Sequence, residues 1–293
     1  MPTKKKQSNS TQIVEMKLSE LHPFKNHPFK VLDDELMQQT IDSISQVGVL
    51  SPAVVRPDPG GGYEIISGHR RLHACEAAGL ETMPVIVKDL TDDEAVIFMV
   101  DSNLQRENIL PSERALAYKM KMEALKHQGQ RNNSTLVQVG QKSWTLDKLS
   151  SETGESKSQI RRYIKMAELL PELLTKVDEK EISLTPAVEL AYLTQDEQQG
   201  FLDAMDYSQN TPSLSQAQRI RKLSQNGTCT VEAMREIMSE EKKSELDKIT
   251  IDTDEVKKYF PRSFTPNQMK NTILKLLETW MKNRAKKRST ERS

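Results

Sequence analysis

A glycine, a histidine and two arginines lie between a strand-like run and a helical run, where they could bind a phosphate. The segment reads Gly68-His69-Arg70-Arg71-Leu72-His73-Ala74, follows the strand-like run 63–66 and leads into an alanine-rich run that ends at Gly79. Glycine lets a backbone approach a ligand closely, and the unpaired N–H groups of a first helical turn attract phosphate. Arginines add fixed charge and forked donors that match phosphate oxygens. A solvated arginine pair at an ordinary turn is the alternative.

A second polar group follows about thirty residues later, at the end of a predicted helix. Thr91 or Asp92 is placed to cap this helix. The apolar residues Ala95, Phe98 and Met99 recur at helical spacing and should face inward. The helix then ends at Ser102-Asn103-Leu104-Gln105-Arg106-Glu107, which brings polar groups to a surface.

A third candidate is a helix-turn-helix pattern at residues 145–165. Thr145 could cap the first helix, and Ser156 could cap the second. Gly154, between them, could form the sharp turn. The outer face of the second helix carries residues able to hold phosphates and read base edges in a major groove. They are Lys157, Ser158, Gln159, Arg161, Arg162 and Lys165. A charged, solvated helix is the alternative.

Together these segments resemble the ParB family of partition proteins. The family's nucleotide-binding box reads Gly-Glu-Arg-Arg-x-x-Ala, and its second box reads Glu-Asn-x-Gln-Arg. This chain keeps Gly68, Arg70, Arg71 and Ala74 of the first box, and Asn103, Gln105 and Arg106 of the second. It has His69 and Ser102 where the family has Glu, and Ser51 where the family frequently has Gln. The resemblance covers roughly residues 14–200 and suggests a plasmid or mobile-element type.

The resemblance implies a CTP site with a divalent cation, used by family members to close a DNA-embracing dimer. Gly68, His69, Arg70 and Arg71 would hold the triphosphate, and Asn103 and Arg106 would complete the phosphate and metal end. The amide oxygen of Asn103 suits Mg²⁺, which prefers oxygen ligands. Because Ser102 lacks a carboxylate, hydrolysis should be slow or absent unless Asp101 compensates. No catalytic residue is assigned, and a slow CTPase activity stays open.

The expected fold is an α+β ParB/sulfiredoxin-like domain, then an all-α helix-turn-helix domain and a helical C-terminal region. We expect a disordered tail at 1–12, the nucleotide-binding domain at 13–128, a linker at 129–143, the DNA-binding domain at 144–225 and the C-terminal region at 226–293. Within the first domain, Asp33 should cap a helix that stops at Gly48, residues 22–28 should form a loop, and a later helix should stop at Gly129.

The C-terminal stretch 266–288 has an apolar stripe at helical spacing followed by basic residues. The stripe consists of Met269, Ile273, Leu276, Leu277 and Trp280, and the basic residues are Lys282, Arg284, Lys286, Lys287 and Arg288. We interpret it as a dimerising helix with a basic tail. Packing of the stripe on the chain's own core is the alternative.

Composition limits the remaining possibilities. The 293 residues include 42 basic and 42 acidic ones, a formal net charge of +0, so nucleic-acid binding must rely on local clusters. The lack of a long apolar run or a secretory leader favours a cytoplasmic protein, and the resemblance to the ParB family implies association with the nucleoid. Cys75 and Cys229 lie far apart in the sequence, which supports neither a disulfide framework nor a CxxC metal site.

The sequence thus predicts a homodimeric, sequence-specific DNA-binding partition protein that binds double-stranded DNA, CTP and Mg²⁺ and works with a ParA-like ATPase. It would serve chromosome, plasmid or mobile-element segregation. One alternative is a nucleotide-dependent kinase or other enzyme on the ParB/sulfiredoxin scaffold, and another is a ParB-like transcriptional regulator without nucleotide turnover. A sulfiredoxin-like activity is disfavoured because Gly68 occupies the position of that family's nucleophilic cysteine.

Overall fold

The computed structural model describes residues 12–106, 108–132, 138–240, 257–261 and 264–290. The chain separates into two compact units, residues 1–240 and 241–293.

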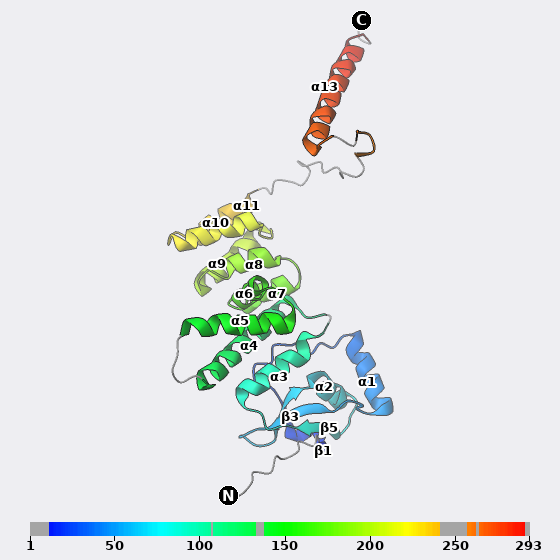
Figure 1. Cartoon of the computed structure of the whole chain (residues 1–293), viewed down its shortest axis with the longest axis vertical. Coiled ribbons are helices and arrows are strands. Elements are labelled where there is room, and N and C mark those ends of the chain that lie inside the picture. The colour runs from blue at the N-terminus through cyan, green and yellow to red at the C-terminus, as the bar shows by residue number, and fades with distance from the viewer. Residues whose placement is uncertain (1–11, 107, 133–137, 241–256, 262–263, 291–293) are drawn as a thin grey trace. The chain divides into compact units, whose positions relative to one another are not determined.

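A mixed five-stranded sheet forms the base of the first unit, with the strand order β1-β5-β3-β4-β2 (Figure 1). The strands are β1 (Ile13–Lys17), β2 (Leu21–Pro23), β3 (Ala53–Pro57), β4 (Tyr63–Ser67) and β5 (Thr82–Val87). Strand β1 pairs antiparallel with β5 and β3 pairs antiparallel with β4, whereas β3–β5 and β2–β4 are parallel. A short 3₁₀ helix, η1 (Leu18–Glu20), joins β1 to β2.

The strand β2 corrects the expectation that residues 22–28 are all loop. Leu21 pairs with Tyr63, and Pro23 pairs with Ile65 at the edge of the sheet. An edge strand has a partner on one side alone, so it tolerates a proline that the interior of a sheet would reject.

Helices cover both faces of the sheet. Helices α1 (Glu35–Val47) and α2 (His69–Ala77) pack on one face, where the core includes Ile65. Helices α3 (Asp92–Leu104) and α4 (Pro111–Asn132) contribute to the core that includes Ile66. Successive side chains of a strand point to opposite faces, so β4 supplies one residue to each core and ends directly at Gly68.

The cap of α1 lies one residue later than predicted. The Asp34 carboxylate accepts a hydrogen bond from the backbone N–H of Met37 at 2.8 Å. Asp33 instead bonds the Nε2 of His73 on α2 at 2.6 Å. Both aspartates can cap a helix, and the contact with α2, which local sequence does not reveal, decides between them. The predicted stop at Gly48 is confirmed, with φ of +74°.

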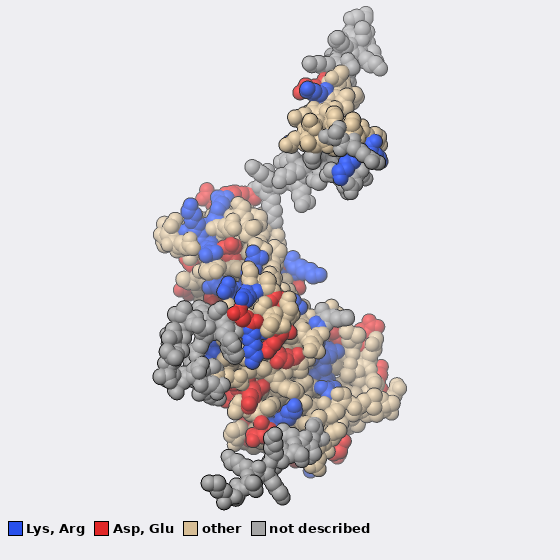
Figure 2. Space-filling model, viewed as in Figure 1, with Lys and Arg blue, Asp and Glu red and all other residues tan. Residues whose placement is uncertain are grey.

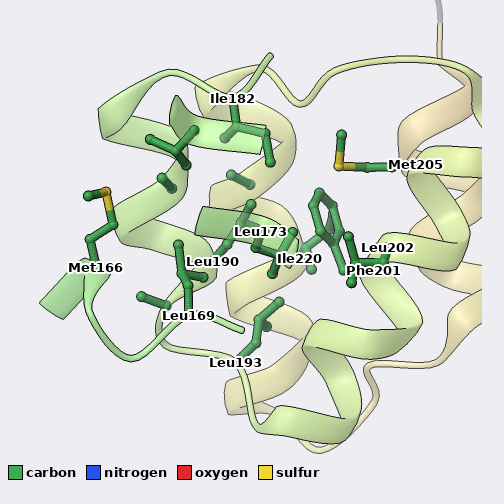
Figure 3. Close-up of a cluster of buried hydrophobic side chains, with 14 of the residues drawn as sticks. Met166, Leu169, Leu173, Ile182, Leu190, Leu193, Phe201, Leu202, Met205 and Ile220 are labelled. Carbon is green, nitrogen blue, oxygen red and sulfur yellow. The ribbon is translucent and has the colours of Figure 1, made fainter. Parts of the chain in front are cut away.

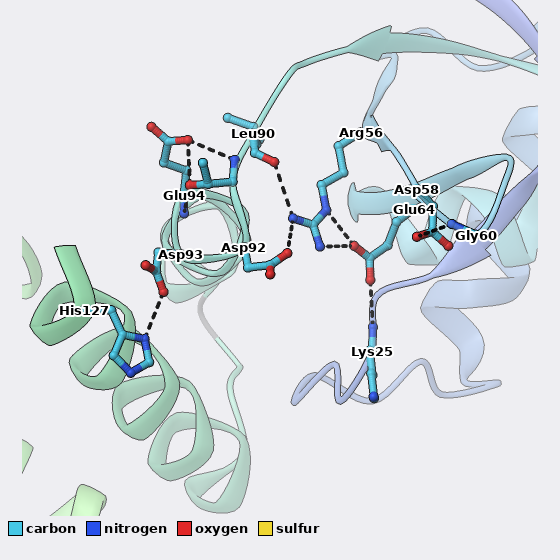
Figure 4. A network of polar contacts seen from close by, with 11 residues as sticks. Lys25, Arg56, Asp58, Gly60, Glu64, Leu90, Asp92, Asp93, Glu94 and His127 are labelled. Atoms are coloured by element: carbon cyan, nitrogen blue, oxygen red, sulfur yellow. Dashed lines mark hydrogen bonds and ion pairs between the residues drawn. The ribbon is translucent and has the colours of Figure 1, made fainter. Parts of the chain in front are cut away.

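An ionic network ties the start of α3 to the sheet (Figure 4). Arg56 on β3 bonds Glu64 on β4 at 2.6 Å and Asp92 in the first turn of α3 at 2.7 Å. Glu64 also accepts from the backbone N–H of Lys25 at 3.1 Å. Thr91 caps α3 through a reciprocal capping box with Glu94, which confirms one of the two predicted caps. The position of α3 on the sheet is therefore fixed at its N-terminal end.

The remainder of the first unit is helical. Its helices after α4 are α5 (Gln138–Thr153), α6 (Lys157–Met166), α7 (Pro171–Asp178), α8 (Leu184–Leu190), α9 (Gln195–Ser208), α10 (Leu214–Gln225) and α11 (Val231–Ser239). Helices α6 to α11 share a core built around fully buried residues such as Leu173, Leu190, Phe201 and Ile220 (Figure 3).

The stretch predicted as a linker is largely helical where it is described. Helix α4 continues past Gly129 to Asn132, and α5 begins at Gln138, so Thr145 lies inside α5 and does not cap it. Residues 133–137 lie outside the described residues. Polar composition misled the prediction, because Gln, Asn and Ser are tolerated in a helix when its other turns pack on a neighbour.

In the second unit, α13 (Pro266–Thr290) agrees with the predicted C-terminal helix. Its predicted stripe is only partly covered: Met269 is buried, whereas Leu276, Leu277 and Trp280 are 64%, 52% and 55% exposed. Among the described residues, no helix is long and apolar enough to cross a membrane. Cys75 is buried and Cys229 half-buried, both as free thiols.

Candidate phosphate-binding site and basic recognition helix

Gly68 forms the junction between β4 and α2. It has φ of +120°, a region that residues with a side chain rarely adopt, and a Cβ placed on it would lie 2.7 Å from the Cβ of the buried Ala53. Its carbonyl accepts from the N–H of Leu72 at 2.9 Å and so begins the helix. The predicted strand, glycine and helix are all confirmed, and the close approach of β3 explains why glycine is required.

Arg71 is half-buried and held by backbone carbonyls. Its guanidinium donates to the carbonyl oxygens of Ser51 and Pro52, at 2.5 and 2.7 Å. Burial lowers the pKa of Arg71. Arg71 therefore fixes the loop after α1 as well as supplying positive charge.

Arg70 points to the first turn of α1. One guanidinium nitrogen lies 3.5 Å from the Asp34 carboxylate, a weak contact that leaves its other donors available. Adjacent residues on a helix diverge by about 100°. The two arginines consequently serve different neighbours, Asp34 in one case and the loop carbonyls in the other.

A groove of about 410 Å³ lies beside these arginines. Its walls come from α1, from the loop at residues 48–51 and from α2, and they include Leu36, Ser43, Ile44, Arg70 and Arg71. The groove combines an apolar wall with two guanidinium groups. Such a surface suits a ligand with an apolar or aromatic part and an anionic part.

His69 is buried and neutral. Its Nε2 accepts a hydrogen bond from the backbone N–H of Phe24 at 3.2 Å. Burial, the neighbouring His27 and the charge of Arg106 lower the pKa of His69 to about 3. His69, which stands where the family has Glu, is therefore neutral and anchors the loop after β2 through this hydrogen bond.

Arg106 brings the second box to the first. It follows α3, and its charge lowers the pKa of His69, Arg71 and His27. The protein atoms packed around its guanidinium lower the pKa of Arg106 itself, and the charge of Arg70 lowers it further. Like charges that lower one another's pKa repel one another, and an anion bound among them would relieve this repulsion. The fold has thus assembled a cationic cluster at the start of α2 from segments about 35 residues apart.

Asn103 is buried at the end of α3, close in sequence to this cluster. Its Nδ2 donates to the carbonyl of Met99 at 2.8 Å and to the hydroxyl of Ser102 at 3.3 Å. With the nitrogen engaged in this way, the amide oxygen is the group through which Asn103 could bind a cation. No cluster of three His, Cys, Asp or Glu side chains that could hold a metal occurs among the described residues.

Asp101 does not compensate for Ser102. Its carboxylate forms an ion pair with the fully buried Lys121 of α4, which also bonds Glu152 of α5 at 2.6 Å. Asp101 and Ser102 project from different sides of α3 because of the helical rotation. The suggestion that Asp101 could turn into the nucleotide site is therefore wrong.

The predicted DNA-reading helix is α6. Ser156 caps it by accepting from the N–H of Gln159 at 3.2 Å, and Gly154 has φ of +72° in the turn, as expected. Ile160 packs inward against Leu149 of α5.

The six candidate side chains on α6 differ in their surroundings. Lys157, Ser158, Arg161 and Arg162 are exposed, whereas Gln159 and Lys165 are half-buried. Lys157 pairs with Asp147 and Lys165 pairs with Glu168. Arg161 and Arg162 form no ion pair with any residue in the described part of the chain. Over the viewed face of the first unit, cationic and anionic side chains alternate (Figure 2), so α6 is a local feature and not part of a uniformly basic surface.

Sequence reasoning missed two contributors to the phosphate-binding region. His27 stacks on His69, and the carbonyls of Ser51 and Pro52 orient Arg71. The His27-Pro28 pair indicated a break in regular structure and gave no sign of its spatial partner. Only the tertiary fold brings residue 27 to residue 69.

These features give a candidate phosphate-binding turn on an α+β domain followed by helices, and a family model matches this domain. Residues 2–104 match the model described as ParB N-terminal domain. This part of the chain is therefore similar to the ParB N-terminal domain.

The most similar relatives include partition proteins. The chain is 32% identical over 171 residues to the chromosome-partitioning protein Spo0J of Thermus thermophilus, covering 58% of this chain and 56% of that protein. It is 34% identical over 187 residues to the probable chromosome 1-partitioning protein ParB of Deinococcus radiodurans, covering 64% and 58% respectively. The chain thus matches a little over half the length of these relatives.

Structures of the C-terminally truncated chromosome-partitioning protein ParB of Caulobacter crescentus are also similar. The complex with the centromeric parS site is 22% identical with a TM-score of 0.41, covering 77% of this chain and 98% of that chain. The complex with CTP-gamma-S is 26% identical with a TM-score of 0.31, covering 63% and 94%.

Proposed function

We propose that this chain is a DNA-binding partition protein whose N-terminal domain binds CTP. The observation that carries the proposal is the position of Arg106, which joins the Gly68 turn in one cationic cluster. Both family boxes contribute to this cluster, as a triphosphate site requires. Gly68 and His69 supply the turn and the start of α2, and Arg70, Arg71 and Arg106 supply the positive charge.

The groove beside α1 supports a nucleoside as the organic part of the ligand. It is lined by the two arginines of α2, and its volume of about 410 Å³ is large enough for a base and sugar. The choice of CTP over other nucleotides rests on the resemblance to the family's boxes. Ser51 stands in the loop where the family frequently has Gln, so the contacts to the base would differ in this chain.

Binding of double-stranded DNA would fall to α6. Arg161 and Arg162 are exposed and unpaired among the described residues, so binding a phosphate would break no ion pair described for them. To bind DNA, Lys157 would have to break its ion pair with Asp147, and Lys165 its ion pair with Glu168. Ser158 and Gln159 complete the face with groups that can bond base edges.

The remaining parts of the proposal concern assembly. The exposed leucines and tryptophan of α13 are suited to a homodimer interface, since contiguous exposed apolar side chains usually mark an interaction site. CTP would close the dimer around DNA, with Mg²⁺ bound through the phosphates and Asn103. The protein would associate with the nucleoid and work with a ParA-like ATPase in segregating a chromosome, plasmid or mobile element.

Two measurements test the proposal. Calorimetry on the full chain with Mg²⁺ should detect CTP binding, with ATP and GTP binding more weakly. Pulldown of DNA bound in cells, followed by sequencing, should return one or a few discrete sites. CTP binding without discrete DNA sites would favour an enzyme on this scaffold, and discrete sites without nucleotide binding would favour a transcriptional regulator.

A further inference from the structure

Two imidazole rings lie against each other at the candidate phosphate site. The ring centroids of His27 and His69 are 3.7 Å apart, with 32° between the ring planes. His27 lies in the loop after β2, and His69 is the first residue of α2. His27, which belongs to neither family box, thus contacts His69 of the first box.

The loop that carries His27 is held at both ends. Phe24 donates its N–H to His69, and Lys30 donates its N–H to Glu113 of α4 at 2.7 Å. Glu113 is buried, so this second anchor is firmly placed. The position of His27 is therefore a property of the fold and not of a freely moving loop.

The hydrogen bonds define the protonation state of the pair. The Nδ1 of His27 lies 2.7 Å from the carbonyl oxygen of Phe29, so it must donate and carry the proton. The Nε2 of His27 is buried and has no hydrogen-bond partner among the described residues. Burial lowers the pKa of His27, and the charge of Arg106 lowers it further. The free protein accordingly holds two neutral rings, one with an unsatisfied nitrogen.

The charges around the pair explain why it is neutral. The charge of Arg106, two residues after the end of α3, acts on both rings, and Arg70 on α2 adds to the positive charge around Arg106. Glu113 on α4 opposes that charge. A polyphosphate bound at this cluster would bring several negative charges beside the rings and would reverse the balance, since a nearby anion favours the protonated imidazole.

We propose that His27 is a phosphate-binding residue of this site, and that the stacked His27 and His69 rings take up one proton from solvent when a nucleoside triphosphate binds. The Nε2 of His27 gains that proton and donates a hydrogen bond to a phosphate oxygen. A second proton is disfavoured, because two like charges on rings this close repel each other. This inference rests on the proposed nucleotide binding and adds the residue and the proton that would accompany it.

The test is calorimetry of CTP binding to the full chain at neutral pH, in two buffers with different enthalpies of ionisation. The difference in measured enthalpy gives the number of protons taken up. The terminal phosphate of CTP titrates in the same pH range, so the quantity of interest is the difference between wild type and His27→Gln. We expect the wild type to take up about one proton more than the variant, and its affinity to fall by up to about tenfold per pH unit as the pH rises.

His22→Gln is the matched control. His22 lies on β2, a few residues before His27, and bonds Asp58 at 3.1 Å, away from the cationic cluster. This variant should behave as the wild type does. NMR of the imidazole resonances of the wild type, with and without CTP, gives a second readout that needs no variant. Of the five histidines, His27 and His69 together should gain one proton when CTP binds.

The possible outcomes distinguish a failure of nucleotide binding from a failure of the role assigned to His27. If the wild type binds no CTP at any pH, the proposed nucleotide site is wrong. If it binds CTP with the same proton uptake as His27→Gln, or with no change in the histidine resonances, nucleotide binding stands and the role of His27 is overturned.

Discussion

The guanidinium of Arg71 donates to the carbonyl oxygen of Pro52 at 2.7 Å, so this candidate phosphate ligand also fixes the loop between α1 and β3. Arg70, its neighbour, lies 3.5 Å from the Asp34 carboxylate. One wall of the groove is that same loop. Ligand binding and loop position are therefore linked through Arg71 and not through Arg70.

The first prediction compares Ala substitutions at the two arginines. Both should abolish measurable CTP binding, because each removes a cation from the cluster. Arg71→Ala should also lower the free energy of unfolding by about 1–3 kcal/mol, since it loses hydrogen bonds from a charged donor to two carbonyls. Arg70→Ala should cost less than about 1 kcal/mol, as is usual for a weak, partly exposed ion pair. Calorimetry and urea unfolding measure the two effects. Equal stability of both variants would contradict the assigned role of Arg71.

The second prediction concerns acid stability of the free protein. His69 has a pKa of about 3 in the folded chain and an ordinary value near 6.5 when unfolded, so the unfolded state binds the proton first. Stability is therefore greatest above pH 6.5 and is lost as the pH falls. The contribution of His69 between pH 7 and pH 5 is a loss of about 2 kcal/mol. Urea unfolding of the wild type and His69→Gln at both pH values checks it, because the variant should lose that much less. An equal loss in both proteins would show that His69 is not held neutral.

The sequence indicated much of the phosphate site because its parts are local. A glycine before a helix and arginines in its first turn have a direct meaning, and the structure brings Arg106 to them as expected. Contacts between distant segments carry no local signal. The stacking of His27 on His69, the pairing of Asp101 with Lys121 and the burial of Arg71 all depend on such contacts.

The same distinction applies to the fold. Periodicity predicted α1, α2, α3 and the sheet strands β3 to β5 well, because alternating or helical spacing of buried residues is visible in the chain. It failed at residues 138–143, where polar composition suggested a linker but α5 has already begun. The division of residues 1–240 into a nucleotide domain and a DNA domain stays a prediction.

The third prediction concerns Ser102→Glu, which restores the missing carboxylate of the second box. Asp101 is paired with Lys121, so it does not supply that charge to the site. Ser102→Glu should raise CTP hydrolysis by on the order of tenfold, equivalent to about 1.4 kcal/mol of barrier. Release of phosphate under saturating CTP and Mg²⁺ is the measurement. Ser102→Gln has the same length without the charge and should stay at the wild-type rate. If both variants hydrolyse CTP equally, the carboxylate is not what the wild type lacks.

The fourth prediction concerns the second unit. Leu276→Asp and Leu277→Asp together would place charges in an apolar interface, which is strongly unfavourable. Light scattering should then report a monomer, while circular dichroism shows the first unit still folded. Asn271→Asp adds a charge on an exposed position of the same helix and should leave the dimer intact. A wild type that is already monomeric, or a double variant that remains dimeric, rejects the interface.

The last prediction concerns DNA binding by α6. Arg161 and Arg162 are exposed and form no ion pair with described residues, so their charges are available to DNA at no cost in broken contacts. If either contacts a phosphate, its change to Ala should reduce the slope of log affinity against log salt by about 1. If either reads a base, the change should cost about 1–3 kcal/mol on the specific site and much less on unrelated DNA. Binding to a recovered DNA site and to a scrambled duplex, each at several salt concentrations, separates these cases.

Arg219→Ala is the control, because it removes the same charge from α10, where Arg219 is paired with Glu240 at 2.5 Å. Loss of affinity in the control equal to that in the α6 variants would mean that general charge, and not this helix, holds the DNA.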